Sequence, residues 1–225
     1  MTIFLILLDD ITEYNKKVIN AGNTPIDVYE VCSIIRTTFC TSYGIRKNNQ
    51  LYIYFNRQKL LIRFEGNKLR YLGPDERSQA LLLEKAFSKS QEQERKLGGE
   101  EWIDSTPGIL VKNLNSINSL IRFLKLLEQP KLTCICKPFS LVNIGFLYHA
   151  YEQPKWVKFE QLNLKNEKFF ILIPNNDMLI LLLKKVIELY PSILEIFTLV
   201  IMNNIKSLSD KTLYINFKLD QMNNR

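Results

Sequence analysis

Apolar residues in this chain form short continuous runs, and longer segments between the runs carry apolar positions every three or four residues. A short apolar run bounded by polar or turn residues is typical of a strand that is buried on both faces. The runs lie at 1–8, 51–55, 60–64, 109–111, 132–136, 169–173 and 195–202. We expect a strand at each of them.

The segments between the runs predict helices. Apolar positions from Val28 to Phe39 follow helical spacing, with Thr24 as the expected N-cap and Pro25 in the first turn. A second helix is expected to open at 73–74, with Asp75 or Glu76 as its cap, and further helices are expected in 118–130 and 178–191. Residues 91–101 are expected to form an exposed loop or a frayed helix, and a polar tail should follow residue 202.

Strands that alternate with helices favour an α/β fold with a mostly parallel sheet flanked by helices. The chain has 225 residues, 46% of them hydrophobic and 24% charged, which are ordinary values for a globular protein. We detect neither an internal repeat nor a low-complexity tract. We therefore expect residues 1–225 to form a single domain.

The basic charge is concentrated in one segment. The formal net charge is +7, and residues 41–72 contain seven basic side chains but one acidic side chain, Glu65. Tyrosines are interleaved with these bases, a pattern that favours a phosphate-rich partner such as RNA. The alternative is a solvated sheet surface on which charges protect an edge strand. The candidate RNA-binding residues are Arg46, Lys47, Arg57, Lys59, Arg63, Lys68 and Arg70, together with Arg77 just beyond the segment.

Cysteines, histidine and hydropathy exclude several classes of protein. Four cysteines are too few for a disulfide scaffold of this length. Cys134 and Cys136 have no second pair, and the single histidine, His149, is not adjacent to them, so we expect no metal site. The N-terminal run lacks a basic flank and meets Asp9 at once, which argues against a signal peptide. We expect a soluble, cytoplasmic protein without a membrane partner.

The stretch "KFFILIPNND" at 168–177 places a loop directly after a buried strand, where α/β proteins bind ligands. A nucleotide-binding loop at this point would be expected to contain glycine, because glycine lets backbone N–H groups approach the ligand. Here Pro174 follows the strand instead.

Three segments in a fixed order carry a family resemblance: "YGIRKN" at 43–48, "GPDERSQALLLEKAF" at 73–87 and "WIDSTPGILV" at 102–111. Singly, each is explained by capping or turn chemistry. Together they resemble the SPOUT superfamily, and within it the archaeal methyltransferases that methylate N1 of pseudouridine in the tRNA T-loop. "IKSLSDKTLYINFKLD" at 205–220 is faintly similar to a fourth family segment.

The resemblance implies a parallel α/β domain whose C-terminal segment forms a trefoil knot, a feature otherwise almost absent from proteins. It also implies S-adenosylmethionine bound in the knot, a homodimer, and RNA across the dimer face. The matching donor-binding positions are Pro174, Ser207, Leu208, Ser209 and Leu213.

Several of these positions depart from the family pattern. Pro174 replaces a glycine, and Asp210, Lys211 and Tyr214 differ from the family's second donor-binding stretch. In "YGIRKN", Gly44 and Asn48 replace acids, so the resemblance supplies no catalytic residue. These departures predict that the knot is degenerate, that the donor-binding residues are vestigial and that no cofactor is bound.

Three functions remain open. The first is a non-catalytic RNA-binding protein on a SPOUT fold, bound to ribosomal RNA within a subunit or to another structured RNA, and either dimeric or embedded in a larger assembly. The second is an active S-adenosylmethionine-dependent tRNA pseudouridine N1-methyltransferase. The third is a protein-interaction module that uses the dimer face. The residues place the first reading ahead of the other two.

Overall fold

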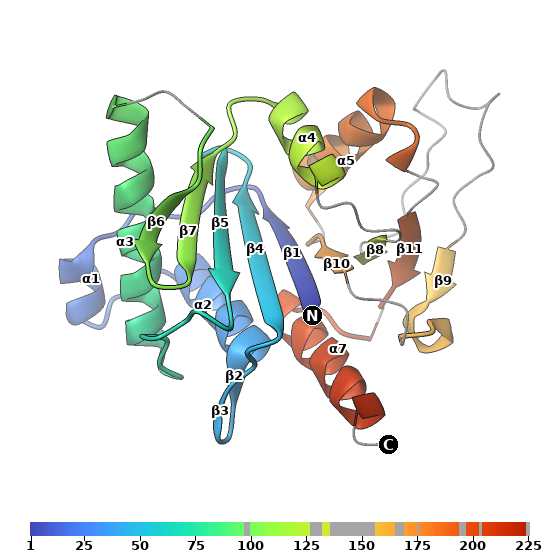
Figure 1. Cartoon of the computed structure of the whole chain (residues 1–225), viewed down its shortest axis with the longest axis horizontal. Coiled ribbons are helices and arrows are strands. Elements are labelled where there is room, and N and C mark those ends of the chain that lie inside the picture. Colours follow the sequence, from blue (N-terminus) through green and yellow to red (C-terminus); the bar gives the residue numbers. More distant parts are fainter. Residues whose placement is uncertain are drawn as a thin grey trace.

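A computed structural model describes residues 1–96, 100–126, 132–135, 156–164, 169–174, 176–193, 197–202 and 204–223. In these ranges it contains a nine-stranded sheet, a two-stranded hairpin and six α-helices (Figure 1). The strands of the large sheet are β1 (Thr2–Leu8), β4 (Asn49–Phe55), β5 (Leu60–Glu65), β6 (Ile103–Thr106), β7 (Ile109–Asn113), β8 (Leu132–Ile135), β9 (Trp156–Lys158), β10 (Phe169–Leu172) and β11 (Phe197–Ile201). The hairpin consists of β2 (Cys40–Thr41) and β3 (Gly44–Ile45).

The sheet has the order β6-β7-β5-β4-β1-β10-β8-β11-β9. Strands from β4 through β1 to β9 are parallel, and the pairs β4–β5, β5–β7 and β6–β7 are antiparallel. The expected α/β class with a mostly parallel sheet is confirmed, with a three-strand antiparallel extension at one end. The carboxyl ends of the parallel strands lie along one edge of the sheet, which is where ligands bind in such folds.

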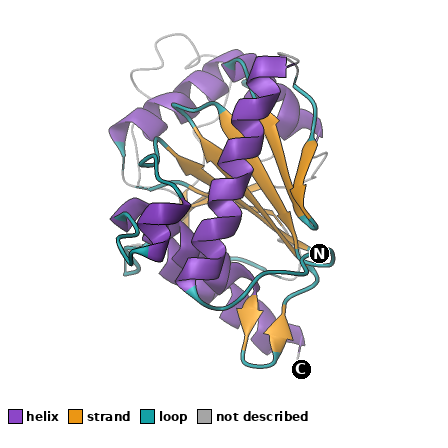
Figure 2. Ribbon diagram, turned by 90° about the vertical axis from the view of Figure 1, so that its left-hand side faces the viewer, coloured by secondary structure: helices purple, strands orange, loops and turns teal. Residues whose placement is uncertain are grey.

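Helices cover both faces of the sheet. They are α1 (Lys16–Asn20), α2 (Ile26–Phe39), α3 (Glu76–Lys96), α4 (Ile117–Leu126), α5 (Asp177–Leu189) and α7 (Leu208–Asn223). Strand β1 sends Phe4 and Ile6 into a core with α2, α3 and α7, and Ile3 and Leu5 into a second core with α4 and α5. Figure 2 shows the sheet between these layers. Burial on both faces explains why the parallel strands are continuous apolar runs.

Helix boundaries differ from the sequence expectation in three places. Thr24 does not cap α2; Pro25 holds the N-cap position without a side-chain cap hydrogen bond. Helix α3 begins at Glu76, after the Gly73–Pro74 turn, and continues through residues 91–96, so the first part of the expected loop is helical. The capping role of Asp75 is confirmed, because its Oδ1 accepts a hydrogen bond of 2.8 Å from the Ser78 N–H.

The expected polar tail is wrong, because residues 208–223 form helix α7. Its buried positions are Lys211, Thr212, Ile215 and Asn216, which form a helical stripe against α2. Three of these four side chains are polar, so the stripe leaves little hydrophobic signal in the sequence. The expected knot stays a prediction, because the chain between β8 and β9 lies outside the described ranges.

Candidate functional site

A cavity of about 540 Å³ lies where the chain leaves β1 and β10, and we refer to it as the strand-end cavity. Three parts of the chain line it: the segments that follow these strands, the first half of α2, and the start of α7. Its lining residues are Leu8, Asp9, Asp10, Asp27, Glu30, Val31, Ile34, Pro174, Asn176, Lys206, Ser207, Leu208 and Ser209. Residues from both ends of the chain therefore form one site at the carboxyl edge of the parallel strands.

Acidic side chains dominate one wall of the cavity. Asp9 is mostly buried, with 12% of its side chain exposed, and its Oδ2 lies 3.1 Å from the Arg57 Nε. Asp10 lies 3.5 Å from the same guanidinium, and its Oδ1 accepts from the Ile11 N–H. Asp27 accepts from the Thr12 N–H at 2.5 Å. Three of the four carboxylates are therefore held in place by neighbouring donors.

Glu30 is the remaining carboxylate of this wall. It is exposed on α2, and among the described residues its side chain has neither a hydrogen bond nor an ion pair. A carboxylate without a partner is available to accept a hydrogen bond or a proton from a ligand in the cavity. Sequence reasoning missed these acids, although Asp9 and Asp10 directly follow a buried parallel strand.

The opposite wall contains the loop after β10. The Asn176 side chain accepts from the Met178 N–H at 2.9 Å and so caps α5. Pro174 lines the cavity, and Asn175 lies outside the described residues. Helix α5 follows the loop and packs into the second core through Leu179 and Leu183.

The start of α7 also lines the strand-end cavity. The Ser207 hydroxyl accepts from the Asp210 N–H at 3.0 Å and lies 3.2 Å from the Ser209 hydroxyl. Four of the five predicted donor-binding residues, Pro174, Ser207, Leu208 and Ser209, thus line one cavity. The fifth, Leu213, is 49% exposed and lies one turn further along α7, outside this cavity lining.

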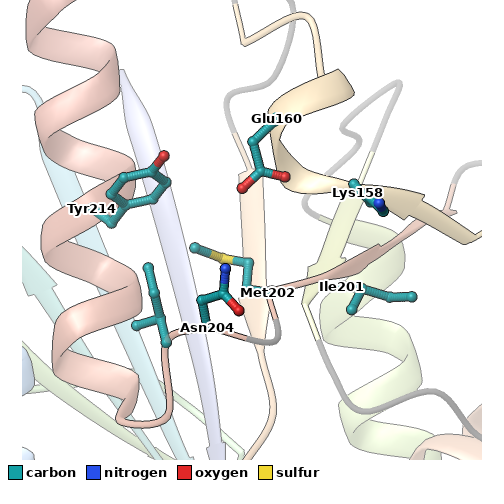
Figure 3. Close-up of a pocket in the computed structure, with 7 residues that line it drawn as sticks. Lys158, Glu160, Ile201, Met202, Asn204 and Tyr214 are labelled. Atoms are coloured by element: carbon teal, nitrogen blue, oxygen red, sulfur yellow. The ribbon is translucent and has the colours of Figure 1, made fainter.

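A second cavity of about 470 Å³ is lined in part by the segment that precedes α7, and we refer to it as the Tyr214 cavity. Figure 3 shows its lining, which comprises Lys158, Glu160, Ile201, Met202, Asn204, Ile205 and Tyr214. The Tyr214 ring packs against Phe159, with 5.4 Å between ring centroids. Tyr214 therefore does not fill the strand-end cavity, and neither does the buried Lys211, which is not part of its described lining.

The predicted RNA-binding residues do not form one surface. Arg57 and Lys59 lie in the β4–β5 turn, at the carboxyl edge. At the opposite edge lie Arg46, Lys47, Lys68 and Arg70. The β4 strand separates the two groups by about 20 Å, because its seven residues rise about 3.3 Å each.

The other two predicted RNA contacts are engaged within the protein. Arg63, in the middle of β5, forms an ion pair of 2.8 Å with Glu65, and its guanidinium lies 4.5 Å from the Trp102 ring centroid. Arg77 donates to the Asn20 side chain at 3.0 Å. Both side chains therefore have structural partners.

Within the described ranges, no group of three or more histidine, cysteine or acidic side chains could hold a metal ion. Cys136 and His149 lie outside those ranges. No described helix is both long enough and apolar enough to cross a bilayer.

The fold and the cavity define an α/β protein with an acidic cavity at the ends of its parallel strands. The chain matches, over residues 11–132, the model of a family described as "Putative SAM-dependent RNA methyltransferase". Because this match covers more than half of the chain, the chain belongs to that family of S-adenosylmethionine-dependent RNA methyltransferases.

The curated relatives are archaeal enzymes named tRNA (pseudouridine(54)-N(1))-methyltransferase. The chain is 34% identical to the one from Methanosarcina acetivorans over 94 residues, which are 40% of this chain and 41% of the relative. It is 32% identical to the Haloferax volcanii enzyme over 96 residues, 43% of this chain and 45% of the relative. For the Methanocaldococcus jannaschii enzyme the identity is 31% over 98 residues, 42% of this chain and 47% of the relative. The chain thus spans less than half the length of each of these relatives.

These comparisons correct the leading functional reading of the sequence. A non-catalytic RNA-binding protein of the ribosome, or a catalytically inactive relative, is not supported, because the family and the relatives are methyltransferases. The error came from treating Pro174, Lys211 and Tyr214 as replacements that block the donor site. In the structure Pro174 lines the strand-end cavity, whereas Lys211 and Tyr214 are not among its lining residues.

The residues of the strand-end cavity fit the chemistry of S-adenosylmethionine. The donor combines a sulfonium cation, ribose hydroxyls, a planar aromatic adenine and an amino-acid carboxylate. Carboxylates suit the cation and the hydroxyls, and Val31 and Ile34 offer apolar surface. The Ser207 and Ser209 hydroxyls, together with the positive end of the α7 helix dipole, suit an anion. The volume lies within the range of small-molecule pockets.

Proposed function

We propose that this chain transfers the methyl group of S-adenosylmethionine to N1 of a pseudouridine in tRNA. The observation that carries the proposal is the strand-end cavity of a chain that belongs to an RNA methyltransferase family. Two segments on which the family resemblance places the donor, at Pro174 and at Ser207–Ser209, line this cavity together. The pseudouridine acceptor is proposed from the names of the relatives.

The bound donor supplies an electrophilic methyl group. In the transfer, N1 of the base forms a bond to the methyl carbon while the sulfur–carbon bond breaks, so the sulfonium becomes a neutral thioether. N1 carries a proton in pseudouridine, and this proton must leave. The protein therefore needs a proton acceptor and groups that fix the donor.

We assign each cavity residue a task according to the contacts that its side chain already makes within the protein. Asp9 and Asp10 share an ion pair with Arg57, which favours their charged forms and suits them to hold ligand hydroxyls rather than to take a proton. Glu30 is assigned as the proton acceptor, because its carboxylate has no partner among the described residues. Ser207 and Ser209 are assigned to the carboxylate end of the donor.

Donor binding is tested first and separately from transfer. Purified protein is heated with S-adenosylmethionine, with its demethylated product, or with neither. A ligand at 100 times its Kd adds roughly 2.7 kcal/mol to the free energy of unfolding, which raises Tm by several degrees at this size. Absence of any shift at millimolar donor would remove the donor from the proposal.

Transfer is tested with two tRNA transcripts that differ at one nucleotide, pseudouridine or uridine. Each is incubated with methyl-labelled donor, and digested nucleosides are identified by mass spectrometry. Label is expected in the pseudouridine transcript alone, because N1 of uridine is bonded to ribose and cannot accept a methyl group. Label in neither transcript, or in both to the same extent, would overturn the proposed acceptor.

A further inference from the structure

We infer that a surface at the sheet edge opposite the strand-end cavity binds the RNA substrate through its phosphates and unpaired bases. The surface, which we call the loop edge, consists of residues 42–48 around the β2–β3 hairpin and residues 66–71 after β5 (Figure 1). The identity of the RNA as tRNA rests on the proposed function. The placement of the binding surface rests on the observations that follow.

Close backbone packing joins the two loops. The Gly66 N–H donates to the Asn49 carbonyl at 3.0 Å, and a Cβ at position 66 would lie 2.8 Å from that oxygen. The same Cβ would also collide with the carbonyl of Arg46. Only glycine permits this approach, so the loop that carries Lys68 and Arg70 is fixed against the one that carries Lys47.

A third segment supports the loop edge from the side. Gly108, in the β6–β7 turn, has φ +84°, and a Cβ there would lie 2.6 Å from the Leu69 backbone nitrogen. In addition, the Glu65 N–H donates to the Gly108 carbonyl at 2.8 Å. The loop edge is therefore a preorganised surface in which backbone contacts set the positions of the side chains.

The charge of the loop edge is uniformly positive. Its two segments contain Arg46, Lys47, Lys68 and Arg70 and no acidic residue. The nearest acids among the described contacts are already neutralised: Glu65 is buried and lies 2.7 Å from the Lys68 Nζ, and Asp220 of α7 forms an ion pair with Arg46. Lys47 and Arg70 are exposed. Such a surface complements the evenly spaced phosphates of a nucleic acid.

Two exposed aromatic rings accompany these cations. Tyr43, at the hairpin tip, is fully exposed, and Tyr71 is 67% exposed. Neither ring is needed in either hydrophobic core. Unpaired bases stack on such rings in single-stranded loops of RNA. An RNA loop would use both features of this surface, because its phosphates pair with the cations and its bases stack on the rings. An acidic protein segment would use the cations alone, so the combination favours RNA.

The charge of the surface is tested with a double variant, Lys47→Ala/Arg70→Ala, and with a matched control, Lys16→Ala/Lys17→Ala on α1. Binding of fluorescent pseudouridine-containing tRNA is measured by anisotropy at several salt concentrations. The loop-edge variant is expected to weaken binding and to reduce the slope of log K against log salt by about 1.5, for two lost phosphate contacts. The control is expected to keep the slope. Equal slopes for the two double variants would overturn the inference.

The aromatic rings are tested with Tyr43→Ala/Tyr71→Ala against Tyr29→Ala, a half-exposed tyrosine on α2. Loss of stacking is expected to weaken tRNA binding about fivefold or more while the salt slope stays unchanged. Poly-glutamate serves as the acidic-protein competitor. If it displaces tRNA as well as unlabelled tRNA does at equal charge, the partner is acidic protein and the inference fails.

Failure of this inference can be told apart from failure of the proposed function. The donor-induced rise in Tm is recorded for every variant and is expected to match the unaltered protein, which also shows that the variants fold. If methyl transfer occurs but the loop-edge variants leave KM for tRNA unchanged, the binding surface is wrong and the function stands. If tRNA binding depends on the loop edge but no methyl group is transferred, the surface stands and the reaction is wrong.

Discussion

The side-chain amide of Asn49, at the start of β4, donates a hydrogen bond of 3.1 Å to Oδ1 of Asn216 in α7. Both side chains are buried, and Asn49 also donates to the Thr38 carbonyl at 2.8 Å. Asn216 in turn donates to the Thr37 carbonyl at 3.0 Å. These polar contacts thus join α7 to the end of α2 and to the sheet. Hydrophobic burial alone would not fix the position of α7 along α2, whereas directional hydrogen bonds do.

Replacing Asn216 by Ala should lower the free energy of unfolding by about 2 kcal/mol, because buried backbone and side-chain groups lose their partner. Urea denaturation of the two proteins measures this difference. Leu213→Ala on the exposed side of the same helix is the control, and it should change stability by about 0.5 kcal/mol or less. Similar losses for both variants would show that the polar contacts do not hold α7 in place.

Glu30→Gln should slow methyl transfer by a factor of about 10² to 10⁴, since an amide cannot take the N1 proton. Donor binding should change much less, because the substitution keeps the shape of the side chain. Single-turnover rates with pseudouridine tRNA, set beside the donor-induced shift in Tm, separate the two effects. Glu13→Gln, outside the strand-end cavity, is the matched control. A rate that stays within threefold of the unaltered protein would exclude Glu30 as the acceptor.

Asp75→Ala should lower the free energy of unfolding at neutral pH by about 1 kcal/mol, the usual effect of losing an N-terminal cap. The hydrogen bond from the Ser78 N–H holds the pKa of Asp75 below its ordinary value. The stabilisation is therefore complete above the unfolded-state pKa of about 4 and disappears as the pH falls through the lower native pKa.

The check is to measure the stability difference between Asp75→Ala and the unaltered protein at several pH values. The difference should be constant from pH 7 to about pH 5 and should shrink below about pH 4. A difference that grows on acidification would contradict the capping role.

Cys32 should resist alkylation in the folded protein. Burial raises the pKa of its thiol to about 12, and the nearby Glu76 carboxylate adds to the effect. Little reactive thiolate is then present at neutral or mildly alkaline pH. Iodoacetamide labelling followed by peptide mass spectrometry should find Cys32 unmodified until denaturant is added. Labelling of Cys32 at the rate of a free thiol in native buffer would show that α2 opens readily.

Much of the central sheet could be predicted from the sequence, because β1, β4 and β10 are buried on both faces and their apolar runs are unbroken, and in β5 only Arg63 interrupts the run. Helix α7 could not be predicted, because its buried stripe includes the polar residues Lys211, Thr212 and Asn216. The Thr212 and Asn216 side chains form hydrogen bonds in the interior, so their burial does not depend on hydrophobicity. A periodicity argument detects only apolar stripes.

The candidate site was predictable in part. The likeness to a known family identified Pro174 and Ser207–Ser209, and the fold brings them together across the strand ends. The acidic wall required the structure, because Asp9 and Glu30 are separated by a helix and a loop and meet only when α2 packs against β1. The prediction of one RNA-binding surface failed for a different reason. It grouped residues that are close in sequence, but residues such as Lys59 and Lys68 lie at opposite ends of strand β5.

Helix α7 runs from the strand-end cavity, at Ser207 and Ser209, to the loop edge, where Asp220 pairs with Arg46. Its 16 residues span about 24 Å, so one rigid element carries contacts to both proposed ligand sites. In the proposed function, an RNA phosphate that drew Arg46 away from Asp220 would act on the same helix whose start lines the proposed donor site. The two binding equilibria would then be coupled, and linkage would make the coupling reciprocal. Whatever factor S-adenosylmethionine imposed on the affinity for RNA, RNA would impose on the affinity for S-adenosylmethionine.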